Sequence, residues 1–136
     1  MEESDEAKKD VRIETVSTAD APVAQGPYSQ ALKVNGMVYC SGQIPLDPRT
    51  GNLVEGGIEQ QTRQVLSNLK AVLAAAGSSL DQTVMTTVFL ADMGDFARVN
   101  AICAEVYGTA KPTRSCVQVA ALPRGAHIKI DAIAVA

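Results

Sequence analysis

One arginine lies in a setting that suits recognition of an anion. Arg114 sits in an extended, mostly small and apolar segment, Thr113-Arg114-Ser115-Cys116-Val117, directly after Pro112. An unpaired guanidinium is costly to bury, and its planar fork can hold a carboxylate through two parallel hydrogen bonds. Two partners fit this arginine: the carboxylate of a ligand, or the carboxylate of Asp131 in the same chain. The residues alone leave both open.

Cys116 is the second candidate for chemistry, because it lies two residues further along the same predicted strand and so shares a face with Arg114. A thiol becomes a nucleophile when a nearby cation or a helix N-terminus depresses its pKa, and Arg114 could act in this way. The only histidine is His127, which we expect to be solvated or hydrogen-bonded and not to be a ligand, and no histidine base is expected near Cys116. The pattern therefore favours Cys116 as a small apolar residue.

Two further positions suit a binding site for a small molecule. Tyr28 follows Gly26-Pro27, a stiff segment that would hold the phenol hydroxyl in place, although packing of the loop is an equally simple role. Gly42, in Ser41-Gly42-Gln43, stands at the end of a predicted strand. A glycine there either lets a ligand approach the backbone or merely permits a bulge.

Hydrophobic periodicity predicts six strands and two helices that would position these residues. The predicted strands cover 11–16, 31–34, 37–41, 83–90, 113–121 and 127–135, and the helices cover 58–76 and 95–107. Asn35-Gly36 is a strong hairpin signal between the second and third strands. In the last strand, alternation puts His127, Lys129 and Asp131 on one face. The sequence thus predicts an α+β fold in which two helices cover one face of a mixed sheet.

The other face of the sheet would need a different cover. A neighbouring subunit is the favoured one, so we expect a homo-oligomer, with a monomer as the alternative. The chain of 136 residues fits one domain over 11–136, after an acidic tail over 1–10 that we expect to be disordered. No apolar run is long enough to span a membrane, and the polar start lacks a secretory signal, so a cytoplasmic location is expected.

Charge and cysteine content exclude several classes of function. The net charge is −3, and residues 1–10 hold five acids and two lysines, which leaves ten acids and ten bases in the rest of the chain. A neutral body disfavours binding to nucleic acid. Three dispersed cysteines and one histidine argue against a zinc site or a disulfide framework, and no nucleotide-binding or catalytic-triad motif occurs. We expect no cofactor.

Several strings along the chain, in order, resemble the RidA/YjgF family, also called the L-PSP or reactive-intermediate deaminase family. The matching strings are Ala24-Gln25-Gly26-Pro27-Tyr28-Ser29-Gln30, Val38-Tyr39-Cys40-Ser41-Gly42-Gln43-Ile44-Pro45, Thr86-Thr87-Val88-Phe89-Leu90, Val99-Asn100-Ala101, Pro112-Thr113-Arg114-Ser115-Cys116-Val117-Gln118-Val119 and Ile130-Asp131-Ala132-Ile133-Ala134-Val135. The resemblance runs from about Val11 to the C-terminus and identifies the chain as a member of this family.

The resemblance implies a chorismate-mutase-like fold, a homotrimer with ligand clefts between subunits, and hydrolysis of reactive enamines and imines. The substrates would be small 2-imino carboxylates such as 2-aminoacrylate, and the products a 2-keto acid and ammonia, with no cofactor. By position, Arg114 would clamp the substrate carboxylate, and the backbones of Cys116 and Gly42 would line the cleft. Tyr28, Ser41 and Asn100 would complete its polar wall.

The chain departs from the family pattern at Lys129, where members with this deaminase activity usually carry glutamate. A carboxylate can order water or exchange a proton with the amine, whereas a lysine ammonium is a poor base. Three classes of function therefore remain. They are an imine deaminase, which is favoured; a carboxylate-binding or partner-binding protein with weak catalysis; and the endoribonuclease or translation inhibitor attributed to some relatives.

Overall fold

A tight hairpin forms the centre of the N-terminal half of the fold. The computed structural model describes residues 11–136, so the tail predicted for residues 1–10 lies outside the described part. Strands β2 (Ala31–Val34) and β3 (Met37–Gln43) pair in antiparallel fashion. The turn residues Asn35 and Gly36 have φ values of 51° and 76°, the two left-handed conformations that a type I′ turn requires. The predicted hairpin is confirmed.

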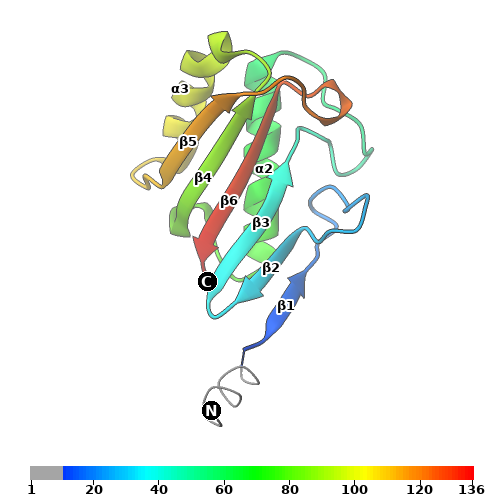
Figure 1. Ribbon diagram of the computed structural model, residues 1–136, viewed down its shortest axis with the longest axis vertical. Helices are drawn as coiled ribbons and strands as arrows, with labels where there is room; N and C mark the ends of the chain where they lie inside the picture. The colour runs from blue at the N-terminus through cyan, green and yellow to red at the C-terminus, as the bar shows by residue number, and fades with distance from the viewer. Residues whose placement is uncertain (1–10) are drawn as a thin grey trace.

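Six strands form one mixed sheet in the order β1-β2-β3-β6-β4-β5 (Figure 1). The remaining strands are β1 (Ile13–Val16), β4 (Thr83–Leu90), β5 (Thr113–Gln118) and β6 (Ile128–Val135). Neighbouring strands are antiparallel except β4 and β5, which are parallel. Strand β5 ends at Gln118 and not at Ala121 as predicted, and the chain then passes through a short 3-10 turn, Pro123–Gly125, before β6.

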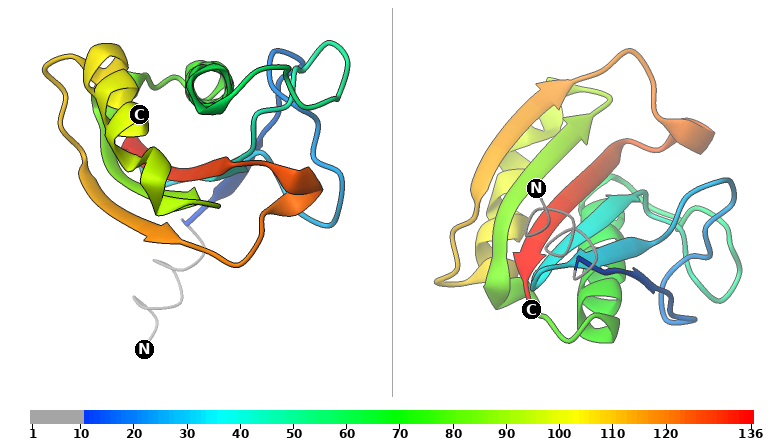
Figure 2. Two further views of the ribbon diagram at one scale, coloured as in Figure 1. Left: turned by 90° about the horizontal axis from the view of Figure 1, so that it is seen from above. Right: turned by 60° about the horizontal axis from the view of Figure 1, so that its bottom comes forward.

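Both helices lie on the same face of this sheet, as predicted, and the view from above in Figure 2 shows them side by side over it. Helix α2 (Ile58–Ala75) packs on β3 and β6, and helix α3 (Phe96–Tyr107) lies towards the β4–β5 end. The core of α2 consists of large aliphatic residues, namely Val65, Leu66, Leu69, Val72 and Leu73. No helix among the described residues is long and apolar enough to cross a membrane.

The last turn of α3 differs from the apolar stripe that helical spacing predicts, namely Phe96, Val99, Ile102, Cys103 and Val106. Val99, Ile102 and Cys103 are buried as predicted, but Tyr107 is buried and Val106 is half-buried. A tyrosine at this position projects its ring over the sheet, and Gly108, with a φ of 61°, then ends the helix. The consequence is a polar hydroxyl beneath the helix, close to the candidate site.

Strand alternation sorts the candidate residues between the two faces of the sheet. In β6 the even-numbered residues from Ile128 to Ala134 are buried under the helices, so Lys129 and Asp131 point to the opposite face. In β5, Arg114 lies over the ring of Phe96 in α3, which places it on the helix face. Arg114 and Lys129 therefore lie on opposite faces of one sheet.

No described residue covers the face opposite the helices. Several of its apolar side chains are exposed in the single chain, namely Ile13, Tyr39, Met85, Val117 and Val135. A row of large apolar side chains across one face of a sheet is typical of a surface that a partner covers. The fold thus has the uncovered face that the sequence predicted.

A buried glutamine fixes the loop that precedes β2. The side chain of Gln30 is almost fully enclosed, and its Oε1 accepts a hydrogen bond of 2.7 Å from the backbone N–H of Thr18. Its Nε2 donates to the carbonyl oxygens of Thr18 and Pro22, at 3.0 Å and 2.8 Å. One side chain therefore satisfies several backbone groups of a loop that has no regular structure of its own.

We predict that Gln30→Ala lowers the free energy of unfolding by about 2–4 kcal/mol, because buried backbone groups of residues 18–22 lose their partners. Equilibrium unfolding in urea measures this change. The matched control is Gln25→Ala in the same loop, whose side chain is exposed and whose loss should cost less than about 0.5 kcal/mol. Equal effects of the two substitutions would show that the Gln30 amide does not hold the loop.

Candidate functional site

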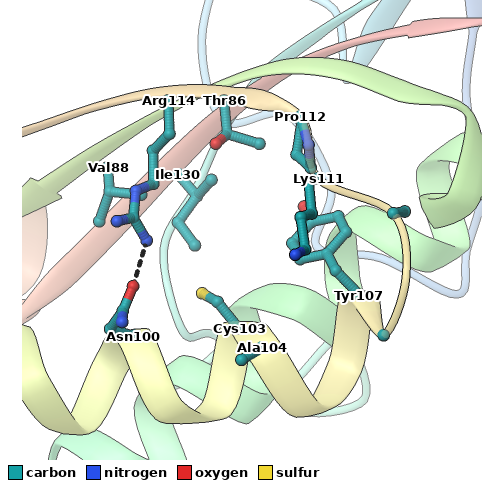
Figure 3. A pocket seen from close by; sticks show the side chains of 12 residues that line it. Thr86, Val88, Asn100, Cys103, Ala104, Tyr107, Lys111, Pro112, Arg114 and Ile130 are labelled. Atoms are coloured by element: carbon teal, nitrogen blue, oxygen red, sulfur yellow. Dashed lines mark hydrogen bonds between the residues drawn. The ribbon is translucent and has the colours of Figure 1, made fainter.

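Arg114 is held in place by two residues of helix α3. Its Nη1 donates a hydrogen bond of 2.7 Å to Oδ1 of Asn100, and its guanidinium carbon lies 5.3 Å from the centre of the Phe96 ring (Figure 3). The side chain is exposed, and among the described residues no carboxylate forms an ion pair with it. The fork is thus oriented by an amide and a ring while its charge stays uncompensated, as an anion-binding arginine requires.

The alternative partner, Asp131, is ruled out by the fold. Asp131 lies on the opposite face of the sheet, where its Oδ1 is 3.8 Å from Nζ of Lys129. Strand alternation explains the separation, because odd-numbered residues of β6 point away from the helices whereas Arg114 points towards them. The hypothesis of an Arg114–Asp131 pair was therefore wrong, and the partner within the chain is the neutral Asn100.

A cavity of about 400 Å³ opens beside Arg114, between helix α3 and the sheet. Its lining comes from α3, from the α3–β5 connection and from the strands beneath, and comprises Thr86, Val88, Asn100, Cys103, Ala104, Tyr107, Gly108, Ala110, Lys111, Pro112, Arg114 and Ile130. This volume lies within the range of small-molecule sites. Figure 3 shows Cys103 and Ile130 pointing into the space, with Arg114 and Asn100 together on one side.

The cysteines near the cavity are poorly suited to nucleophilic attack. Burial raises the pKa of the Cys116 thiol, and the positive charge of Arg114 opposes this only in part. The pKa of Cys103 is raised for the same reason, again with partial opposition from Arg114. Thiols with raised pKa values stay protonated at neutral pH. The geometry supports the interpretation of Cys116 as a small apolar residue that packs against the core.

Tyr107 brings a buried hydroxyl to the far end of the cavity. Burial is the main cause that raises its pKa to about 12. The Thr83 hydroxyl is near enough to lower that pKa slightly, but within the described part of the chain neither hydroxyl has a hydrogen bond of good geometry. The tyrosine is therefore neutral at physiological pH.

A second group of candidate residues lies on the β2–β3 side of the molecule. The Tyr28 hydroxyl accepts a hydrogen bond of 3.1 Å from the backbone N–H of Gln25, so the stiff loop does hold it, although the ring is exposed. Ser41 donates its hydroxyl to the carbonyl oxygen of Ser29 at 2.6 Å. Tyr28 and Gly42 line a second cavity of about 320 Å³, together with Arg124.

Gly42 sits in a bulge, and its missing side chain makes room for residues of the same chain. The register of β3 against β6 shifts between Cys40 and Gln43, which is the bulge that one interpretation expected. A Cβ at Gly42 would collide with the side chains of Lys129 and Asp131. Lys129 also lies 5.0 Å from the centre of the Phe89 ring, so both ring and carboxylate fix its position on the uncovered face.

The predicted site residues thus fall into two groups that a single chain keeps apart. Arg114, Asn100 and Cys116 lie on the helix face, at the edge of the sheet. The other group, Tyr28, Ser41, Gly42 and Lys129, lies around the β3 bulge. Sequence reasoning missed the roles of Phe96, Cys103 and Tyr107, which were assigned to a helix stripe or not noticed. The structure places all three near Arg114.

The side chains that could ligate a metal ion are dispersed in the described part of the chain. Across residues 11–136 no set of three histidine, cysteine, aspartate or glutamate side chains is arranged to hold a metal ion. The site consists of the oriented guanidinium of Arg114 beside a cavity lined by polar and apolar side chains. Such an arrangement binds a small carboxylate and leaves the remainder of the ligand in the cavity.

A six-stranded mixed sheet covered by two helices on one face matches the solved structures of Rid-type proteins. The family model described as Endoribonuclease L-PSP matches residues 18–136. The chain belongs to the RidA/YjgF/L-PSP family.

Individual relatives agree with this membership. A mouse protein named 2-iminobutanoate/2-iminopropanoate deaminase is 50% identical over 120 residues, which cover 88% of this chain and 89% of the mouse protein. The crystal structure of RidA from an Antarctic Psychrobacter species superimposes with a TM-score of 0.87 at 44% identity, covering 90% of this chain and 99% of that one. The structure of Escherichia coli TdcF with bound serine has a TM-score of 0.86 at 41% identity, covering 90% and 98%.

We predict that the Cys116 thiol reacts slowly with iodoacetamide at pH 7 and that its rate is still rising at pH 9. The sign follows from the raised pKa, because the thiolate is a minor species at every pH below it. Mass spectrometry of the alkylated peptides measures the rate at each pH. Cys116→Ser is the control that identifies the reacting site, since Cys40 and Cys103 are buried. A rate that reaches its plateau below pH 8 would contradict the prediction.

Proposed function

We propose that this protein hydrolyses 2-imino carboxylates and their enamine tautomers, such as 2-aminoacrylate, to 2-keto acids and ammonia. The observation that carries the proposal is the Arg114 guanidinium, oriented by Asn100 and Phe96 beside a cavity and free of any ion pair with a described carboxylate. The name of the mouse relative, a 2-iminobutanoate/2-iminopropanoate deaminase, and the serine bound to TdcF support a small amino or imino acid as the ligand.

Hydrolysis of an imine requires few catalytic groups from the protein. The C=N bond of a protonated imine is already electrophilic, so water adds to C2, the nitrogen takes up a proton, and ammonia leaves as the C=O bond forms. The protein has to bind the carboxylate, orient C2 towards water and leave room for the side chain. Arg114 would do the first, through the hydrogen-bond donors that Asn100 does not engage.

A homotrimer with clefts between subunits would join the two groups of site residues. Arg114 and Asn100 of one subunit would face Tyr28 and Gly42 of its neighbour. Two observations support this arrangement: one chain keeps the groups apart, and the sheet face opposite the helices bears exposed apolar side chains. Burying that face between copies would remove the apolar surface from water, which stabilises the assembly.

Lys129 decides between efficient and weak catalysis. An ammonium group has no lone pair with which to accept the proton that water loses, and the adjacent Asp131 already pairs with it. The leaving nitrogen becomes more basic as water adds and can take the proton itself. We therefore infer that the protein deaminates its substrate slowly and binds 2-keto acids firmly. If the rate of deamination is negligible, the protein is the second candidate, a carboxylate-binding protein.

Ribonuclease or translation-inhibitor activity is not favoured by the charge of the chain. Residues 11–136 carry ten acids and ten bases, so no overall positive field attracts the phosphate backbone. The indications of such an activity are names: the description of the matching family model, and the titles of solved relatives called a putative endoribonuclease or a putative translation initiation inhibitor.

Removal of Arg114 tests the proposed function. A dehydratase that depends on pyridoxal phosphate generates 2-aminoacrylate from serine in the assay, and the protein should accelerate release of ammonia above the spontaneous rate. Arg114→Ala should abolish the acceleration and weaken pyruvate binding about 10- to 100-fold, because a charge-assisted pair is lost. Arg114→Lys should fail nearly as badly, since a point charge does not reproduce the fork.

Arg98→Ala is the matched control, because Arg98 is an arginine of helix α3, which holds Asn100, and it pairs with Asp95 at 3.0 Å, away from the cavity. It should keep full activity. Normal turnover and pyruvate binding in a folded Arg114→Ala protein would overturn the proposal.

We predict that Lys129→Glu raises the deamination rate about tenfold or more and weakens the binding of 2-keto acids. A carboxylate at this position supplies a proton acceptor, worth about 10²–10⁴ in rate where it is well placed, and removes a cation from the cleft. Steady-state kinetics with dehydratase-generated 2-aminoacrylate and calorimetric titration with pyruvate measure the two effects.

Lys129→Gln is the control for loss of charge without gain of a base, and it should weaken binding while leaving turnover low. If Lys129→Glu changes neither turnover nor anion affinity, the side chain lies outside the site. The departure from the family pattern then has no catalytic consequence.

A further inference from the structure

Beside Arg114 and Asn100, the cavity has a mostly apolar wall in which half of the side chains are small. We call it the inner chamber; it is lined by Val88, Cys103, Ala104, Tyr107, Ala110 and Ile130. The strand residues Val88 and Ile130 are almost completely buried, and Cys103 projects towards them from α3 (Figure 3). The chamber exists because Cys103, Ala104 and Ala110 are too small to fill the gap between the helix and the sheet.

The inner chamber and the cation share one cavity. Arg114 and Asn100 form one side of it, whereas Tyr107 and Lys111 lie on the other side (Figure 3). A carboxylate on the Arg114 guanidinium would therefore place the rest of its molecule next to the apolar wall. The cavity as a whole has about 400 Å³, far more than a methyl group fills.

We infer that the inner chamber receives the substrate side chain, so that this protein prefers 2-imino and 2-keto acids with aliphatic side chains of three or four carbons over those with a methyl group. Cys103 and Ala104 are the residues that determine this specificity. The inference rests on the proposed function, because it takes Arg114 to be the carboxylate clamp.

The chamber wall also defines which ligands are rejected. A side chain that ends in a second carboxylate would place this charge between Val88, Cys103 and Ile130, where the one neutral hydroxyl of Tyr107 offsets little of its desolvation. Lys111 is the only cation on that side of the cavity lining, and it is exposed. We therefore expect discrimination against 2-oxoglutarate.

A series of stable 2-oxo acids tests the inference by isothermal titration calorimetry on the full chain. The series is pyruvate, 2-oxobutanoate, 2-oxopentanoate and 2-oxo-4-methylpentanoate, with 2-oxoglutarate as the charged comparator. Each methylene buried in the chamber should tighten binding about fourfold, the equivalent of about 0.8 kcal/mol. The branched acid should bind about 50-fold more tightly than pyruvate, and 2-oxoglutarate more weakly than 2-oxopentanoate.

Two variants fill the chamber from different sides. Cys103→Phe occupies its floor, and Ala104→Leu adds bulk at a position of α3 that is exposed and tolerates a larger helix-forming residue. Both should reduce the ratio of branched-acid to pyruvate affinity to about fivefold or less. The matched control is Ala101→Leu, the same exchange at an exposed position of the same helix that does not line the cavity, and it should keep the ratio.

The outcomes separate this inference from the proposed function. If all four monocarboxylates bind with equal affinity, or if Ala104→Leu keeps the wild-type ratio, the inner chamber is not the side-chain pocket although the Arg114 clamp stands. If 2-oxoglutarate binds most tightly, Lys111 and not the apolar wall selects the ligand, and the inference is overturned. If no 2-oxo acid binds at all, Arg114 does not bind the substrate carboxylate, and both the proposed function and this inference are wrong.

Discussion

Only one face of the six-stranded sheet is covered by helices, and side chains alternate between the two faces along every strand. This constraint decides where each functional group can act. The Arg114 side chain of β5 lies on the helix face, against α3, whereas the odd-numbered residues of β6 point to the uncovered face. Groups only a strand or two apart in the sheet are thereby separated by the sheet itself. Within one chain, Arg114 and Lys129 therefore do not meet in one site.

The orientation of Arg114 illustrates how the fold prepares a cation without neutralising it. Asn100 accepts a hydrogen bond from one nitrogen of the guanidinium through a neutral amide oxygen, and the guanidinium lies over the Phe96 ring. A carboxylate in the place of Asn100 would have held the side chain as well but cancelled its charge. The same helix contributes Cys103 and Ala104, so the clamp and the chamber wall have a fixed relation to each other.

Local signals in the sequence were sufficient for most of the fold. Asn35-Gly36 specified the hairpin through backbone conformations that few other pairs adopt, and the 3.6-residue period specified α2. The contact between Arg114 and Asn100 could not be derived in this way, because it depends on how α3 packs over β5. Asp131 was a plausible partner by charge alone. The cavity also escaped prediction, since small residues in a helix stripe look like ordinary core.

On the proposed assignment, two requirements of the reaction are met by different parts of the assembly. Recognition of the carboxylate and of the side chain belongs to α3 and β5 within one subunit, whereas Lys129 and the Gly42 bulge belong to the other wall of the cleft. Imine hydrolysis permits this division, because the substrate is electrophilic before it is bound and positioning supplies much of the rate. A substitution at Lys129 can therefore change the rate of proton transfer without changing the choice of substrate, which α3 and β5 determine.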